Sequence, residues 1–475
     1  MLCSDLIILT CEYLKDSNYY LLNKALYESI IMVEKGAYWK KKYNNFFKNM
    51  DKEYLILNGD YNWKREYMRV IKFDYWQMIM DNITKLDLSC KKINNIPKEI
   101  GNLINLNELN LSGNRIKEIP KEIGNLINLE VLSFFKNRIK EIPKEIGNLI
   151  GLKKLNLRGN RIKEIPKEIG NLINLEILSF CKNQIKEIPK EIGNLIDLGE
   201  LYLIDNQIKE IPREIGNLIN LSDLDLSENN IKEIPKEIGN LIGLKALFLS
   251  GNQIKEIPKE ISNLIALQYL DFSYNQIEEI SIEISNLINL EGLSFFKNRI
   301  KEIPKEIGNL IGLEELNFGS NQIKEIPREI GNLIGLKGLE LAENNIKEIP
   351  KEIGNLIDLR ELNLSYNRII RIPIELINLK YLNLSNNQIK KIPMELGNLI
   401  NLIQLNLSNN QIIMIPTELG NLIDLKYLYL SNNQIEHIPK ELGKIDLERL
   451  NLSNNHIEQI PKELDNLIKL KKLGL

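Results

Sequence analysis

The sequence contains few of the residues that form redox, metal and nucleophilic sites. It has two histidines, His437 and His456, and four cysteines, which are Cys3, Cys11, Cys90 and Cys181. The cysteines are too dispersed to form a disulfide-bonded cap, which indicates a reducing compartment such as the cytoplasm. No cysteine lies near the histidines, so neither a zinc site nor a nucleophile–base pair is expected. We therefore expect no metal, no cofactor and no enzymatic activity.

Net charge and long apolar runs are also scarce. The formal net charge of the 475 residues is −2, and a nucleic-acid partner would require a concentrated basic surface. No apolar run is long enough to cross a bilayer. The first residues carry Asp5 and Glu12 without a basic lead, which is a poor signal peptide. The composition predicts a cytoplasmic protein that binds neither nucleic acid nor a membrane.

Proline occurs in one local phrase alone. All sixteen prolines follow an isoleucine, and most of them recur every 23 residues from Pro97 onward, with Ser281 in place of one proline. A fixed period of this length predicts a repeat architecture. Because proline fixes its own backbone and disfavours helix in the residue before it, each repeat should begin its outer segment at the same point.

The repeat unit combines a strand pattern with an apolar outer segment. Starting at Leu106, it reads LxxLxLxxNxIxxIPxxIxxLxx. Leu109 and Leu111 alternate as in a short strand, so both should point to one side and Glu108 and Asn110 to the other. One unit cannot bury its apolar side alone, whereas a stack of units can.

This pattern resembles the leucine-rich repeat family over residues 83–475, in about 17 units. The resemblance implies an α/β fold: a solenoid with a curved parallel sheet on the concave face and irregular or short helical segments on the convex side. The asparagine column that begins at Asn114 is predicted to be structural, because an amide can bond backbone groups of adjacent turns. The spacing from Asn367 to Asn387 is twenty residues, which predicts a shortened unit near 368–387 and a local change of curvature.

Residues 1–82 differ from the array in composition. They contain no proline, all three tryptophans and ten of the seventeen tyrosines. Their apolar spacing predicts a small all-α N-terminal domain. The segment from Leu2 to Leu14, followed by Trp39 and Tyr43, resembles the F-box, although Cys3 stands where that family has proline and Thr10 where it has an apolar residue.

The F-box resemblance implies a partner for residues 1–48. That partner would be the adaptor subunit of a cullin-type ubiquitin ligase, and it would contact Leu2, Leu6, Ile7 and Leu14. The alternative is that the same apolar residues cap the open N-terminal end of the array, which a solenoid must cover to stay soluble. Both roles are compatible.

The exposed strand positions vary from repeat to repeat. In contrast, the outer segment of each repeat, which reads IPKEIGNLI and is called the outer phrase, is almost invariant. Variation at these positions is expected where a protein partner is selected on the concave face, and relaxed drift at solvent-exposed positions would give the same pattern. Four aromatic residues fall on successive units: Phe248, Tyr269, Tyr274 and Phe296. They are candidate partner-binding residues. A local aromatic ladder that stabilises neighbouring strands would give the same pattern.

The sequence thus predicts a protein-protein interaction module. The favoured hypothesis is the substrate-recognition subunit of a cullin-type ubiquitin ligase, with the solenoid capturing the substrate. The alternative is a non-enzymatic intracellular scaffold that binds a signalling partner such as a small GTPase, with residues 1–82 acting as a cap. A third hypothesis, a decoy produced by recent duplication, fits the near-identity of the units.

Overall fold

A computed structural model describes residues 83–466 and 472–474 of the chain. The predictions for residues 1–82, including the docking residues Leu2, Leu6, Ile7 and Leu14, lie outside the described residues. The chain divides into two compact units, residues 1–184 and 185–475. Each unit is described separately below.

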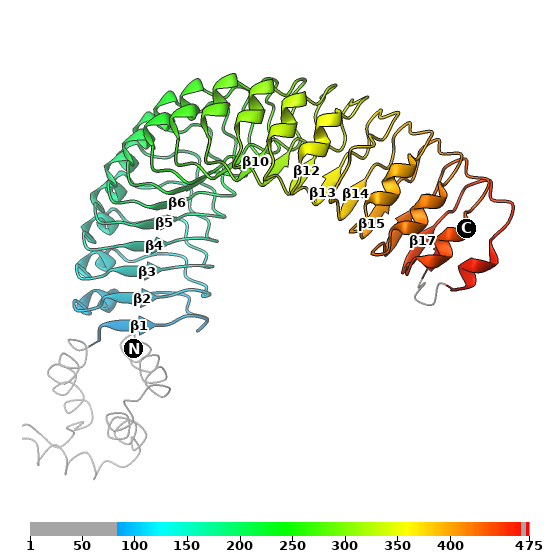
Figure 1. The fold of residues 1–475 in the computed structure, drawn as a ribbon. Coiled ribbons are helices and arrows are strands. Elements are labelled where there is room, and N and C mark those ends of the chain that lie inside the picture. The colour runs from blue at the N-terminus through cyan, green and yellow to red at the C-terminus, as the bar shows by residue number, and fades with distance from the viewer. Residues whose placement is uncertain (1–82, 467–471, 475) are drawn as a thin grey trace, which may run out of the picture. The chain divides into compact units, whose positions relative to one another are not determined.

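Over its described residues, 83–184, the first unit contains five three-residue strands, which pair in sequence order and in parallel. They are β1 (Lys85–Asp87), β2 (Glu108–Asn110), β3 (Val131–Ser133), β4 (Lys154–Asn156) and β5 (Ile177–Ser179). In this described part, four 3-10 helices alternate with the strands and lie on the side opposite to them (Figure 1). They are η3 (Lys98–Asn102), η4 (Lys121–Asn125), η5 (Lys144–Asn148) and η6 (Lys167–Asn171).

The second unit continues the same alternation, and its strands also pair in parallel and in sequence order. The strands are β6 (Glu200–Tyr202), β7 (Asp223–Asp225), β8 (Ala246–Phe248), β9 (Tyr269–Asp271), β10 (Gly292–Ser294), β11 (Glu315–Asn317), β12 (Gly338–Glu340), β13 (Glu361–Asn363), β14 (Tyr381–Asn383), β15 (Gln404–Asn406), β16 (Tyr427–Tyr429), β17 (Arg449–Asn451) and β18 (Lys472–Gly474).

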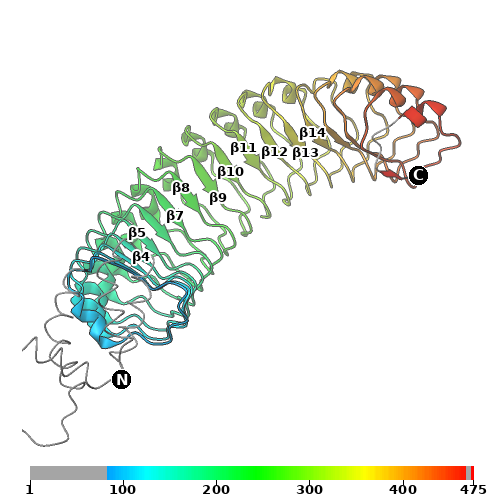
Figure 2. The ribbon, with the colours of Figure 1, turned by 90° about the horizontal axis from the view of Figure 1, so that it is seen from below.

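The helices of the second unit are likewise 3-10 helices of five residues. They are η7 (Lys190–Asn194), η8 (Arg213–Asn217), η9 (Lys236–Asn240), η10 (Lys259–Asn263), η11 (Ile282–Asn286), η12 (Lys305–Asn309), η13 (Arg328–Asn332), η14 (Lys351–Asn355), η15 (Met394–Asn398), η16 (Thr417–Asn421), η17 (Lys440–Lys444) and η18 (Lys462–Asn466). Strands β7 to β14 follow one another across one face of this unit (Figure 2). The predicted fold, a solenoid with one parallel strand face and short helices on the other side, is confirmed.

The alternation of leucines produces this layering. In β2, Leu109 is buried, while Glu108 and Asn110 on either side are partly exposed. The proline of the Ile-Pro phrase fixes the helix start: Pro120 has an extended backbone, with φ −67° and ψ 143°, and η4 begins at the next residue. Ile123 of that helix is fully buried and closes the core from the side opposite the strands.

The asparagine that recurs once in each repeat joins successive repeats by hydrogen bonds to their backbones. Asn252 donates from Nδ2 to the carbonyl oxygen of Leu226, one repeat earlier, and to that of Leu249 in its own repeat, both at 3.0 Å. Its Oδ1 accepts from the backbone N–H of Ile231 at 2.9 Å. The same pattern recurs at Asn275 and Asn298. The prediction that these asparagines are structural is confirmed, because each amide satisfies backbone groups that would otherwise be buried without a partner.

Three buried phenylalanines extend the core in the middle of the second unit. Phe272, Phe295 and Phe318 occupy the column where most units have leucine, and all three are fully buried. Their rings stack on one another at centroid distances of 5.6 and 5.5 Å. The stack supplies an aromatic contribution beyond its buried area.

The repeat between β13 and β14 is shorter than the repeats on either side of it. Twenty residues separate Glu361 from its register partner Tyr381, whereas 23 separate Gly338 from Glu361. No 3-10 helix forms between these strands. Leu376 and Leu379 nonetheless remain buried, so the core is continuous through the shortened turn.

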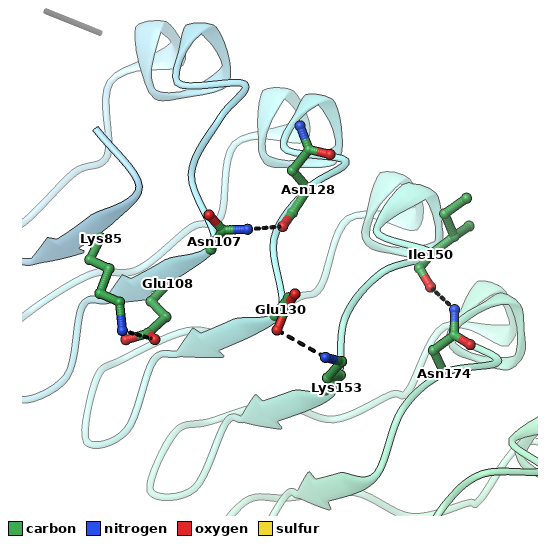
Figure 3. Close-up of polar contacts among 8 residues, drawn as sticks. All are labelled: Lys85, Asn107, Glu108, Asn128, Glu130, Ile150, Lys153 and Asn174. Atoms are coloured by element: carbon green, nitrogen blue, oxygen red, sulfur yellow. Dashed lines mark hydrogen bonds and ion pairs between the residues drawn. The ribbon is translucent and has the colours of Figure 1, made fainter. Parts of the chain in front are cut away.

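Polar contacts on the surface link neighbouring repeats, between residues 21 to 24 positions apart in the sequence (Figure 3). In the first unit, Glu130 accepts from Lys153 at 3.0 Å, and Asn174 donates to the carbonyl oxygen of Ile150 at 2.8 Å. Lys85 pairs with Glu108 in the same way. Because the ion pairs are solvent-exposed, each contributes little to stability, typically less than about 1 kcal/mol.

Candidate protein-binding groove

The exposed strand face of the second unit is hollowed into a groove. Its volume is about 780 Å³, and its lining residues come from strands β8 to β15. The residues that flank the central leucine of each strand form its surface, because side chains alternate across a strand. The groove therefore presents residues that the core does not constrain.

Large and small residues alternate along the groove at the first position of each strand. From β9 to β13 these residues are Tyr269, Gly292, Glu315, Gly338 and Glu361, which lie in register. A methyl group at Gly292 would lie 3.0 Å from Cδ1 of Tyr269, and one at Gly338 would overlap a carboxylate oxygen of Glu315. Each glycine thus gives the larger side chain of the preceding strand room to lie across the sheet.

The ionisable residues that line the groove are acidic or phenolic. Asp271, Glu315, Glu340 and Glu361 are among the lining residues, which include no lysine or arginine. Partial burial, followed by repulsion from Glu361 and Glu314, raises the pKa of Glu315 above its usual range. Glu315 therefore favours its protonated form more than a fully solvated glutamate does.

Glu340 accepts a hydrogen bond on each of its two carboxylate oxygens. One of its oxygens accepts from the backbone N–H of Ala342 at 2.9 Å and the other from Nδ2 of Asn363 at 2.8 Å. Burial nonetheless raises its pKa, against the lowering effect of these two hydrogen bonds. The carboxylate is positioned by its neighbours while its charge is uncompensated.

Basic residues flank the groove but do not line it. Lys337 and Arg360 come just before strands β12 and β13. Lys337 pairs with Glu314 at 2.7 Å, and Arg360 donates from Nε to the carbonyl oxygen of Asp358 at 3.2 Å. Lys337 also acts to lower the pKa of Glu315, but burial and repulsion from Glu361 and Glu314 outweigh it.

Tyrosines lie toward both ends of the acidic stretch. Tyr269 is 45% exposed and donates its hydroxyl hydrogen to Glu291 Oε2 at 2.8 Å, which raises the pKa of the phenol. Tyr381 on β14 is 39% exposed. Exposed aromatic rings on a sheet offer a flat apolar surface to a partner.

The four aromatic residues predicted from the sequence occupy two places. Phe248 and Tyr269 line the groove. Tyr274 and Phe296 lie after strands β9 and β10 and pack edge to face at 5.3 Å, with Lys297 Nζ 4.9 Å from the Tyr274 ring centroid. Tyr274 has a left-handed backbone, with φ of 54°. The structure therefore does not bring the four together into one cluster.

Sequence reasoning missed most of the groove residues, including Glu315, Gly338, Glu361 and Tyr381. A sequence signal for the groove was present at the first position of the strands, where Gly292 and Gly338 alternate with larger residues from one repeat to the next. The groove carboxylates could not be distinguished in the sequence, because glutamate is also abundant in the outer phrase of the repeats.

The described residues give little support for other kinds of site. In residues 83–466 and 472–474, no group of three or more His, Cys, Asp and Glu side chains is arranged to hold a metal ion. Within the same ranges, Cys90 is exposed and Cys181 is buried, and both are free thiols. Every helix in this part of the chain is too short or too polar to span a bilayer.

Family models support the repeat pattern. The model described as a leucine-rich repeat region matches residues 82–155, 140–207, 236–326 and 370–475. A second model, described as a leucine rich repeat, matches residues 196–254 and 311–369. No curated protein matches the chain in a sequence search.

Solved structures share the fold over most of the chain. A leucine-rich repeat protein of Leptospira interrogans is 36% identical, with a TM-score of 0.70, covering 85% of this chain and 98% of that one. The plant peptide hormone receptor RGFR1 in complex with RGF2 is 30% identical, with a TM-score of 0.64, covering 83% and 74%. The Arabidopsis receptor kinase HAESA ectodomain in complex with an IDA peptide hormone ligand is 29% identical, with a TM-score of 0.60, covering 80% and 72%.

Proposed function

Because the chain belongs to the leucine-rich repeat family, we propose that it is a non-enzymatic protein-binding module whose groove on strands β8 to β15 holds its partner. Solenoids of this kind serve mainly as interaction scaffolds, because stacking creates an extended concave surface. The observation that carries the proposal is the groove itself, whose lining combines exposed tyrosines, glycines and four carboxylates, in contrast to the nearly uniform outer segment of each repeat. The two plant receptors, whose structures hold peptide hormones, support a polypeptide ligand.

Phe248 and Tyr269 are the predicted residues that this proposal places in contact with the partner. Tyr269 is held by its hydrogen bond to Glu291, so its ring would bind with little loss of conformational freedom. Tyr274 and Phe296 would extend the contact beyond the strand ends, with Tyr274 still 49% exposed after packing on Phe296.

For residues 1–82 we propose the F-box role, with the whole chain acting as the substrate receptor of a cullin-type ubiquitin ligase in the cytoplasm. Support comes from the order of Leu2, Leu6, Ile7 and Leu14, followed by Trp39 and Tyr43, in the sequence. The two free cysteines of the described residues fit a reducing compartment. In this arrangement residues 1–82 bind the ligase adaptor and the groove binds the substrate.

The test is a capture experiment with the full chain in three forms: unchanged, Leu6→Asp, and Tyr269→Ala with Tyr381→Ala. Leu6→Asp should abolish recovery of the adaptor and leave groove-bound proteins unchanged, while the tyrosine variant should do the reverse. If the unchanged chain recovers no adaptor but retains proteins that depend on the tyrosines, the F-box proposal fails and the chain is a scaffold. If the tyrosine variant retains every protein that the unchanged chain binds, the groove is not the binding site.

A further inference from the structure

We infer that the groove selects a basic, extended polypeptide segment, one whose lysine or arginine side chains pair with the carboxylates around Gly338. This inference rests on the proposed function and adds the chemistry of the partner. It is carried by three features that occur together: the acidic lining, the two glycines that let larger side chains lie across the sheet, and the flanking tyrosines.

Three carboxylates surround Gly338. Glu340 lies two residues along the same strand, and Glu315 and Glu361 are its register neighbours on β11 and β13. Parallel strands lie about 4.8 Å apart, so Glu315 and Glu361 sit on backbones roughly 10 Å apart. The Glu315 carboxylate lies over Gly338, where an added methyl group would overlap it. A cationic head group that pairs with Glu315 there would also come near Glu340 and Glu361.

The carboxylates lack a compensating cation within the groove. The lining holds no lysine or arginine, and Lys337, which lies just outside it, is paired with Glu314. The planar guanidinium of arginine can bond carboxylates through two nitrogens at once, which suits a lining with several carboxylates on neighbouring strands.

The length and ends of the groove indicate a polypeptide. Tyr269 on β9 and Tyr381 on β14 are five strand spacings apart, roughly 24 Å, which an extended chain covers with about seven residues. Their rings are exposed and can stack on guanidinium groups or on the aliphatic stems of lysine side chains. Carboxylates between aromatic ends therefore complement a short basic segment along its length.

The experiment measures binding of the full chain to fluorescein-labelled eight-residue peptides: one of alternating arginine and glycine, one of alternating glutamate and glycine, and one of alternating serine and glycine. The basic peptide should bind most tightly, and its affinity should fall as salt is raised, since screening weakens exposed charge interactions. Glu315→Gln with Glu361→Gln should weaken its binding roughly tenfold. The control, Glu279→Gln with Glu302→Gln, removes the same charge at exposed positions outside the groove and should change binding less than about twofold.

Three outcomes would overturn the inference. They are equal binding of the three peptides, equal loss in the groove variant and its control, and no binding of the basic peptide at low salt. Thermal unfolding of each variant establishes that it is folded. Because protein capture through Tyr269 and Tyr381 is measured independently, a groove that retains proteins but ignores the basic peptide would refute the partner's chemistry and leave the binding function standing.

Discussion

The central residue of strands β9, β10 and β11 is leucine in each case, whereas the residue before it is Tyr269, Gly292 and Glu315 in turn. Neighbouring positions of one strand therefore differ sharply in how freely they vary. The leucine must fill a close-packed core between two similar units, while the residue before it must fit only solvent and a partner. The comparison separates the part of each unit that forms the fold from the part that can acquire a function.

The sharpest test replaces phenylalanine on each side of the sheet. Phe295→Ala removes a fully buried ring from a stack and should cost about 3–5 kcal/mol, whereas Phe248→Ala removes a partly exposed groove ring and should cost much less. Because each repeat contacts only its neighbours, hydrogen exchange in the Phe295→Ala variant should rise mainly around β9 to β11. Similar losses in both variants would mean that the groove residues are also core residues.

A second comparison concerns asparagine in two settings. Asn275→Ala leaves the carbonyl oxygens of Leu249 and Phe272 and the backbone N–H of Ile254 without their amide partner, so a loss of about 2–3 kcal/mol is expected. Asn309, at the exposed end of η12, is the matched control, and Asn309→Ala should change stability by less than about 0.5 kcal/mol. Urea denaturation of both variants measures the difference.

A third comparison concerns glycine, which is packed against backbone at Gly331 and against a flexible side chain in the groove at Gly338. A methyl group at Gly331 would lie 2.5 Å from the backbone oxygen of Glu352 in the next unit, so Gly331→Ala should destabilise the array by about 1–2 kcal/mol. At Gly338 the obstacle is the end of the Glu315 side chain, which can rotate away. Gly338→Ala should therefore unfold within about 0.5 kcal/mol of the unchanged chain in urea, and a larger loss would show that the groove is rigid.

The smallest expected effect depends on pH. Because the folded state raises the pKa of Glu315 above its ordinary value of 4.5, folding favours the protonated form. Stability is thus highest below that ordinary pKa and is lost as pH rises through the folded pKa. Glu315→Gln should remove this loss, so the variant should show a flatter pH dependence of the thermal midpoint and be no less stable than the unchanged chain at neutral pH.

The control for this effect is Glu279→Gln, at an exposed position outside the groove. Its thermal midpoint should follow that of the unchanged chain from pH 4.5 to 7. A Glu315→Gln chain that keeps the original pH profile would contradict the assignment of a desolvated carboxylate in the groove.

Much of the array could be predicted from the sequence, because its periodic features are local. The position of Pro120 predicts where the outer segment begins, and the structure starts η4 at the next residue. The bonding of Asn252 to the preceding unit follows from the repeat, since equivalent residues of stacked units must lie side by side. The type of outer segment was less determined, because a five-residue stretch can form a 3-10 turn or irregular structure.

The groove could be predicted in part. Tyr269 and Phe248 were identified as exposed aromatic residues, and both line it. Their grouping with Tyr274 and Phe296 was not predictable from proximity in sequence, because the chain turns away from the strand at Tyr274. The carboxylates around Gly338 could not be distinguished from the many exposed glutamates until the register placed them together.

The sequence by itself determined the repeat, the strand that faces the core and the asparagine column, because each depends on spacing along the chain and on the need to bury leucine and isoleucine. The tertiary structure decided which exposed residues share a surface. Register aligns Glu315, Gly338 and Glu361 across separate strands, and the hollow that they share with Glu340 arises only when the units stack. The electrostatic character of that surface depends on distances across the sheet, which no single repeat contains.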